Sequence, residues 1–322
     1  MSDADVLVIG GGVTGLAAAL ACADGGARVV VLRGSRPPAA LAAGGMLCPS
    51  FEAMHEGGRT LAALGADSLA LWDAFAARVS EGDPTALDYR RGGALGVGYP
   101  PGLVGGRRCD VPAGIEAEGG VLVPGEGQVD PRRLMTALER CLRTASVRLS
   151  EGDAVTLLRE GDAVRGAVTT DGTVRAARTV LATGASGGLA PPGLLRPVRG
   201  RAFAARLAPG DRLDLPGAGV LRAPTVYLCE KADGTLYVGA TEELRAADAV
   251  LDGLWHEACW LVPALARATR TGVFDGMRPG TDDGLPVLRE GAPGLYLALG
   301  QHRNGVLLCP LAARRAAAWA LA

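Results

Sequence analysis

Several features that mark particular protein classes are missing from this sequence of 322 residues. No apolar run reaches the roughly 18 residues needed to cross a bilayer, so we expect no membrane-spanning segment. Basic and acidic side chains nearly balance, 33 against 34, whereas a nucleic-acid-binding surface would need a basic surplus. The apolar share of 48% is typical of a globular protein and excludes disorder for most of the chain.

The pattern of cysteine and histidine excludes two further classes. The seven cysteines are odd in number and form no C-x-x-C pair, and the three histidines lie far apart in the sequence. We therefore expect neither a metal site nor a disulfide framework, and we interpret the cysteines as small buried apolar residues. Residues 1–8 carry Asp3 and Asp5 instead of a basic stretch, so we expect no secretory signal and a cytoplasmic protein.

The first 35 residues contain a glycine turn between two apolar segments. Residues 5–9 and 28–32 read as buried strands, and residues 13–25 between them as a helix, which makes a βαβ unit. The turn has the form G-x-G-x-x-G, in which each glycine has its own task. Gly10 permits the tight turn, Gly12 lets the backbone approach a pyrophosphate, and Gly15 lets helix and strand pack closely. Dinucleotide binding is therefore predicted here, at the helix N-terminus that begins with Val13 and Thr14.

The second strand ends in an unexpected residue. A dinucleotide site usually has an acid here to accept hydrogen bonds from the ribose hydroxyls, but this chain has Arg33, which cannot accept them. Two interpretations stay open. Arg33 reads the 2′-phosphate of NADPH, or the ribose is held by backbone groups or by Ser35 and the cofactor binds less tightly.

The rest of the chain alternates between helical and strand patterns. One helix is marked clearly, because Asp130 is a good N-cap and Pro131 suits the first helical position. Hairpin turns are expected at 160–162 and 171–172, within a set of short strands over 146–182. Helices are predicted over 59–80, 131–144, 250–270 and 306–321, and further strands over 87–98, 121–124, 197–207, 225–229, 235–240 and 295–299.

Because βαβ material stands at both ends of the chain, we predict a discontinuous cofactor domain with a second domain inserted. The fold class is α/β, or α+β overall: a Rossmann-like FAD-binding domain and a mixed-sheet substrate-binding domain. The predicted limits are 1–86, 126–192 and 275–322 for the first domain, and 87–125 and 193–274 for the second.

Six segments in series resemble one known family. They are LAAGGMLCPSFEA at 41–53, GEGQVDPRRLMTAL at 125–138, LRPVRGR at 195–201, VYLCEKADGTLYVGATEE at 226–243, GMRPGTDDGLPVL at 276–288 and LYLALGQHRNGVLLCP at 295–310. The family is the FAD-dependent amine and amino-acid oxidases of the D-amino-acid oxidase fold. Within it, the sequence is most similar to the glycine oxidases of thiamine biosynthesis.

The resemblance implies a site for an amino-acid substrate. Arg278 matches the arginine that binds the substrate carboxylate, and Tyr227 matches a tyrosine whose hydroxyl helps to hold it. A bidentate guanidinium–carboxylate pair is directional and would orient Cα toward the flavin. Thr225 stands where glycine oxidases can carry histidine, a difference that bears on the choice of substrate.

The resemblance also implies a flavin site. Gly45 and Met46 match a turn beside the flavin, and Gly184 matches a glycine near the adenosine part. The stretch 301–305 holds the sole asparagine and one of two glutamines, and its backbone N–H groups would face the flavin ring. Arg303 would support the charge of the reduced ring or line the pocket. The further flavin contacts expected there are Asn304, Gly305 and Val306.

The attachment of the cofactor is expected to be noncovalent. Sarcosine-oxidase relatives link FAD to a cysteine in the segment that matches 276–283, and Gly276 occupies that place here.

The implied reaction is oxidation of glycine or of a small amino acid or amine to an imine, with O₂ giving hydrogen peroxide. We expect a small-molecule substrate, neither nucleic acid nor membrane as partner, and leave a homo-oligomer open. Three alternatives also stay open: a D-amino-acid or N-methyl amino-acid dehydrogenase with another electron acceptor, an inactive flavin-binding subunit, and an NADPH-dependent reductase. Glu230 and Lys231, in place of the family's usual Pro and Arg, keep the inactive subunit in view.

Overall fold

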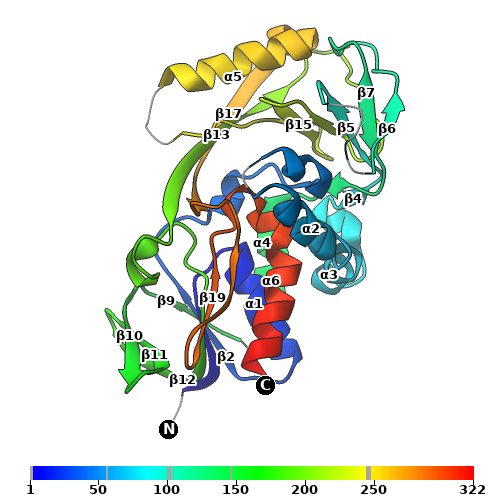
Figure 1. Cartoon of the computed structure of the whole chain (residues 1–322). Helices are drawn as coiled ribbons and strands as arrows, with labels where there is room; N and C mark the ends of the chain where they lie inside the picture. Colours follow the sequence, from blue (N-terminus) through cyan, green and yellow to red (C-terminus); the bar gives the residue numbers. More distant parts are fainter. Residues whose placement is uncertain (1–2, 56, 100–102, 104, 146, 244–247) are drawn as a thin grey trace.

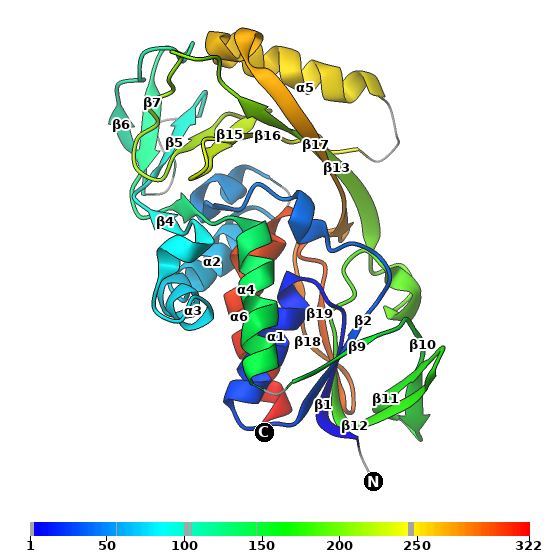
Figure 2. The same cartoon turned by 180° about the vertical axis from the view of Figure 1, so that it is seen from behind.

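The computed structural model describes residues 3–55, 57–99, 103, 105–145, 147–243 and 248–322. Two eight-stranded sheets dominate this part of the chain, one at each end of the molecule (Figure 1). Three helices, α1 (Val13–Asp24), α4 (Pro131–Thr144) and α6 (Gly305–Ala320), lie together beside the first sheet (Figure 2). Among the described residues, none of the helices combines the length and the apolar character that crossing a bilayer requires.

The first sheet is parallel at its centre. Its strand order is β10-β11-β12-β1-β2-β9, with β19 pairing to β12 and β18 to β19. β1 runs parallel to β2 and β12, as the βαβ pattern predicts, and this confirms the expected fold class. The strands are β1 (Ala4–Ile9), β2 (Val29–Arg33), β9 (Arg148–Glu151), β10 (Ala154–Glu160), β11 (Ala163–Thr169), β12 (Gly172–Leu181), β18 (Val287–Ala292) and β19 (Leu295–Leu299).

The second sheet is mixed and covers the other end of the molecule. Its order is β17-β13-β16-β15-β14-β5-β7-β6, and α5 (Asp248–Leu261) packs on β13 and β16. The strands are β5 (Ala94–Val97), β6 (Arg107–Cys109), β7 (Gly120–Val123), β13 (Arg196–Arg206), β14 (Val220–Arg222), β15 (Tyr227–Glu230), β16 (Leu236–Gly239) and β17 (Thr269–Gly280). A small sheet of β3 (Met46–Leu47), β8 (Gly127–Gln128) and β4 (Arg90–Arg91) lies beside it. The boundary that we predicted at residue 275 falls inside β17, and the domain limits stay a prediction.

Two predicted helices differ from the structure. The helical pattern over 59–80 divides into α2 (Gly58–Leu69) and α3 (Trp72–Val79), because α2 packs on α6 whereas α3 packs on α4. The helix predicted over 250–270 is wrong beyond Leu261, where α5 ends. Pro263 has no backbone N–H to continue a helix, so a short 3₁₀ turn follows, and Thr269 already begins β17.

Helix α6 contains a proline, and two neighbouring helices bond to its backbone nearby. Pro310 removes one backbone donor from the helix, and the N–H of the next residue, Leu311, donates to the hydroxyl of Ser68 at 3.3 Å. The carbonyl of Leu307 then accepts from the Ser68 hydroxyl at 2.7 Å and from the Trp72 indole N–H at 2.9 Å. These bonds tie α2 and α3 to the first turns of α6, whose N-terminal end points toward the second sheet (Figure 1).

Candidate functional site

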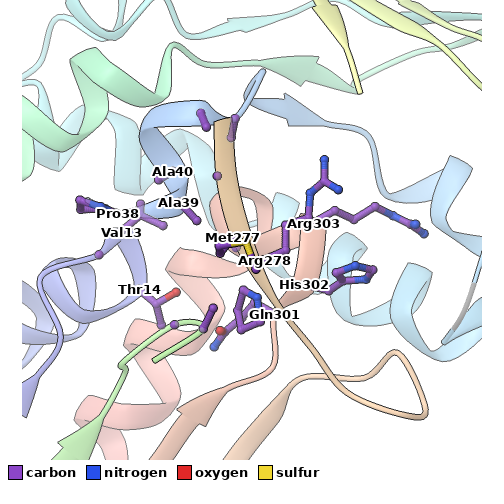
Figure 3. A pocket seen from close by; sticks show the side chains of 18 of the residues that line it. Val13, Thr14, Pro38, Ala39, Ala40, Met277, Arg278, Gln301, His302 and Arg303 are labelled. Atoms are coloured by element: carbon purple, nitrogen blue, oxygen red, sulfur yellow. The ribbon is translucent and has the colours of Figure 1, made fainter. Parts of the chain in front are cut away.

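A cavity of about 1090 Å³ runs from the glycine turn after β1 to strands β15 and β17 of the second sheet. It brings together nearly all of the residues that the sequence singled out. In Figure 3, Val13 and Thr14 lie on one side of β17, while His302 and Arg303 lie on the other. The predicted residues that line the cavity are Gly10, Gly12, Val13, Thr14, Arg33, Gly45, Met46, Gly184, Tyr227, Arg278, Arg303, Asn304, Gly305 and Val306.

The glycine turn presents bare backbone to this cavity. Gly12 caps α1 without a side-chain hydrogen bond, and a Cβ added to it would meet no atom within 4 Å. The first N–H groups of α1 therefore face open space, as an anion site requires. Gly15 does not line the cavity. A Cβ there would lie 2.0 Å from the carbonyl oxygen of Gly10, so this glycine allows α1 to approach the end of β1.

Arg33 lies across the turn, and its charge is compensated. Its Nη2 is 2.6 Å from Oε1 of Glu139 on α4, and its Nε is 3.6 Å from Oε1 of Glu151 at the end of β9. A guanidinium held by two carboxylates is a poor ligand for a 2′-phosphate, so Arg33 does not support the binding of NADPH.

Acceptors for a ribose come from the neighbouring strand. Glu151 lies directly opposite Arg33 in the parallel pair β2–β9 and also lines the cavity. Asp153 lines it too, and its carboxylate accepts from the Ser35 backbone N–H at 3.2 Å and hydroxyl at 3.0 Å. Two acids, one at the end of β9 and one two residues beyond it, thus lie where they can take the place of the acid that β2 lacks.

The N-terminus of α6 forms the next wall of the cavity. Gly300 turns the chain with φ +74°, and His302 follows with φ +46°, a backbone conformation that non-glycine residues rarely adopt. No side chain caps α6, and Nε2 of Gln301 is buried without a hydrogen-bond partner among the described residues. The uncapped start of α6 and the Nε2 of Gln301 therefore supply hydrogen-bond donors, and Gln301 lies next to Met277 and Arg278 of β17 (Figure 3).

The charge of Arg303 is neutralised inside the protein. Its Nε donates to Oε2 of Glu52 at 2.9 Å, and the side-chain amide of Asn304 donates to the same oxygen at 2.9 Å. Burial alone would raise the pKa of Glu52, but Arg303 and Asn304 outweigh it and lower that pKa below its usual value. Glu52 is thus an anion at neutral pH, and its negative charge neutralises the positive charge of Arg303.

Tyr227 lies in a stack of aromatic rings at the far end of the cavity. Its ring centroid is 5.6 Å from that of Tyr237, whose hydroxyl donates to the carbonyl of Ala42 at 2.8 Å. Burial raises the pKa of the Tyr227 hydroxyl, so this group stays protonated and can donate a hydrogen bond.

Arg278 projects from β17 over a glycine of the neighbouring strand. A Cβ on Gly200 would lie 2.3 Å from its guanidinium carbon, so a larger residue there would displace the guanidinium from this position. Its Nη1 donates to the carbonyl of Thr241 at 2.8 Å. In the part of the chain that the structure describes, Arg278 has no carboxylate partner, which leaves its charge free to bind an anion.

The sequence did not predict Glu52, His55 and Arg222, which line the cavity together with Glu151 and Asp153. Arg222 was one arginine among many, in a strand that the sequence did not indicate. Glu52 falls within the segment 41–53 that carries the family resemblance, and this was the one signal that could have found it.

Lys231, which stands where the family usually has arginine, makes buried hydrogen bonds at the edge of the site. Its buried ammonium donates to the carbonyl of Gly44 at 2.6 Å, to Oε1 of Gln128 at 2.7 Å and to the carbonyl of Val129 at 3.2 Å. Gln128 in turn pairs with Met46 between β8 and β3. The only lysine of the chain therefore holds the turn that carries Met46.

The residues present suit FAD. The cavity offers the uncapped helix N–H groups after Gly12 and the unpartnered Nε2 of Gln301. It also offers the guanidinium groups of Arg222 and Arg278, which have no carboxylate partner among the described residues. A pyrophosphate, a polar ring edge and an anionic substrate need these three kinds of group.

Comparison with known proteins gives a family match over nearly the whole chain. Residues 5–319 match the family model described as DAO, FAD dependent oxidoreductase. Glycine oxidase from Geobacillus kaustophilus is 30% identical over 95% of this chain and 90% of that protein. Its crystal structure superposes with a TM-score of 0.83, over 97% of this chain and 92% of that one.

Other relatives are longer than this chain. The bifunctional protein ThiO/ThiG from Nostoc sp. is 30% identical over 96% of this chain but only 51% of its own length. The chain spans between 32 and 51% of the three bifunctional relatives of this kind that it matches.

Proposed function

Because the chain belongs to the DAO family of FAD-dependent oxidoreductases, we propose that it oxidises the amine of glycine or of a small amino acid or amine. One observation carries the proposal: the guanidinium of Arg278, which has no carboxylate partner among the described residues, lines the same cavity as the glycine turn. A carboxylate bound there would face the place where the N-terminus of α6 and Met46 close the cavity. The glycine oxidase relatives support this substrate class.

The cofactor would be held along the cavity in three places. The N–H groups after Gly12 would bind the pyrophosphate, and Glu151 or Asp153 the ribose. The uncapped start of α6, with Asn304 and Gly305, would face the flavin ring. FAD, when bound, supplies the acceptor for two electrons and a hydrogen. Among the described residues, the cysteine that lines the cavity is Cys48. Burial raises the pKa of its thiol well above the usual value, which makes the thiol unreactive, so we propose noncovalent binding of FAD.

The side chains around the substrate would bind and orient it. Arg278 binds the carboxylate by two parallel hydrogen bonds, and the protonated hydroxyl of Tyr227 donates a third. The substrate then has its Cα–H directed at the cofactor and a neutral amine, whose lone pair forms the C=N bond as the hydride leaves. Water hydrolyses the imine. The overall balance is that glycine, O₂ and water give glyoxylate, ammonia and hydrogen peroxide.

The first experiment is the visible spectrum of the purified protein, before and after glycine is added without oxygen. We expect flavin bands that bleach. Flavin bands that persist with glycine but bleach with D-amino acids or N-methyl amines would move the proposal to those substrates. A colourless protein that does not bind added FAD would contradict it.

The electron acceptor is a separate question. Peroxide formation with stoichiometric yield would support O₂, whereas dye reduction without peroxide would support a dehydrogenase. An inactive flavin-binding subunit would show bands that no amine bleaches until a partner protein is added. The supply of an imine for thiamine thiazole, a cytoplasmic location and a homo-oligomer stay predictions.

A further inference from the structure

We propose that Arg222 and His55 form a second anion-binding subsite, so that the preferred substrate is an amino acid that carries a second carboxylate. The inference rests on the proposed amine oxidation and specifies its substrate class. Its starting point is Arg222, the last residue of β14, which lines the same cavity as Arg278.

Arg222 is buried, and few of its hydrogen-bonding groups have partners. The residue is only 6% exposed. Its Nη2 lies 2.7 Å from Nε2 of His55, while its Nε is buried with no hydrogen-bond partner among the described residues. The guanidinium also lies 5.5 Å from the ring centroid of Tyr227. A guanidinium has five N–H donors, so most of the capacity of this one is unused.

His55 does not compensate the charge of Arg222. Burial and the positive charge of Arg303 lower the pKa of His55 to about 4, so its ring is neutral at pH 7. Because arginine only donates, Nε2 of His55 must be the acceptor and Nδ1 must carry the proton. The imidazole therefore orients the guanidinium without neutralising it.

The carboxylates nearest to this end of the cavity are already engaged. Glu52 is bound by Arg303 and Asn304. Glu242 lies 3.6 Å from Arg303 and 3.4 Å from His302. In the described part of the chain, Arg222 and Arg278 thus stand as two cations without a carboxylate partner in one cavity.

Two unpaired cations in a single cavity match a ligand with two negative groups. Burying a guanidinium without a counterion is unfavourable, and a ligand carboxylate placed against it relieves that cost. Tyr227 lies near both arginines, since the positive charges of Arg278 and Arg222 each act to lower the pKa of its hydroxyl. Arg278 would hold the α-carboxylate, and Arg222 the second carboxylate.

The first test compares substrates that differ by one carboxylate. N-methylglycine and N-(carboxymethyl)glycine form one pair, and D-alanine and D-aspartate form another. We expect kcat/KM to be higher for the dicarboxylate in at least one pair, by about 30-fold or more, the range for a buried charge pair.

The second test needs no turnover. Oxydiacetate has two carboxylates joined through an ether oxygen and has no amine to oxidise, and methoxyacetate is its monocarboxylate counterpart. Isothermal titration calorimetry on the flavin-loaded protein should show oxydiacetate binding about 30-fold more tightly or better. In Arg222→Gln this advantage should disappear, and Arg222→Lys should retain part of it because the charge remains.

A matched control is Arg206→Gln. Arg206 is an exposed arginine of β13 that pairs with Asp233 at 3.5 Å, and its loss should leave the oxydiacetate-to-methoxyacetate ratio unchanged. If Arg222→Gln does not fold, the ratio in the unmodified protein still decides the matter.

The outcomes separate the two proposals. If glycine bleaches the flavin but oxydiacetate binds no better than methoxyacetate, the subsite is wrong and the amine oxidation stands. If no amine bleaches the flavin but oxydiacetate binds through Arg222, the subsite stands and the proposed reaction fails.

Discussion

A single oxygen of Glu52 accepts from both Arg303 and Asn304, at 2.9 Å each, across 251 and 252 residues of sequence. This carboxylate is almost fully buried and joins the segment that follows β3 to the loop that starts α6. Glu52 therefore fixes the position of the residues that would face the flavin, although it is itself a residue that the sequence did not single out.

Replacing Glu52 with alanine should destabilise the protein by about 3–5 kcal/mol, because Arg303 would lose its buried partner. Urea unfolding monitored by circular dichroism measures this. Glu160→Ala is the matched control, since its ion pair with Arg175 is exposed and should contribute about 1 kcal/mol or less. Equal effects of the two substitutions would show that the Glu52 pair is not structural.

Arg278→Ala should lower kcat/KM for glycine by a factor of about 30 to 3000, as expected for the loss of a buried charge pair of about 2–5 kcal/mol. Arg278→Lys should recover only part of it, because an ammonium cannot form the bidentate pair. The control is Arg267→Gln, an exposed arginine paired with Asp211 at 2.8 Å, which should behave like the unmodified protein. A loss of less than about threefold in Arg278→Ala would exclude the proposed role.

Two glycines of the turn should respond differently to the same substitution. Gly12→Ala places a methyl group in the open cavity, so FAD affinity should fall about tenfold or more while the stability of the flavin-free protein changes little. Gly15→Ala forces a methyl group against the Gly10 carbonyl and should destabilise the flavin-free fold by about 1–3 kcal/mol or more. Fluorescence titration with FAD and urea unfolding give the two readouts. The reverse pattern would mean that Gly12 does not face the cofactor.

Glu126 should make stability depend on pH near neutrality. Burial raises its pKa to about 7, against a usual value of about 4.5. Between these values the folded protein binds more protons than the unfolded chain, so stability falls as pH rises, by about 3 kcal/mol in total. Glu126→Gln should remove this slope. Urea unfolding of both proteins at pH 5 and pH 8 tests it, and parallel slopes would contradict the assignment.

Local patterns predicted some elements closely. Helix α4 spans Pro131–Thr144 as expected, and the Asp130 side chain accepts from the backbone N–H of Arg132 at 2.8 Å. The βαβ unit and the hairpins at 160–162 and 171–172 also agree with the structure. In each case the signal and its partner lie within a few residues, so the chain's own geometry decides the outcome.

Strands that depend on distant partners were not found. β17 pairs with β13 along its whole length, although its sequence, TRTGVFDGMRPG, has no clear alternation and its first two residues fall within the helix predicted over 250–270. β14 has only three residues and exists because β5 and β15 lie on either side of it. Arg222 belongs to this strand, which is why its place in the cavity could not be predicted.

The sequence by itself determined the dinucleotide turn, the family and the arginine that would hold a carboxylate, because each is written in contiguous residues whose spacing has one physical use. Only the tertiary structure decided how the charges are compensated. Arg33 is neutralised by acids from α4 and β9, and Arg303 by Glu52. The reason is that an ion pair depends on distance in space, and the residues in these pairs are far apart in the sequence and meet only when the chain has folded.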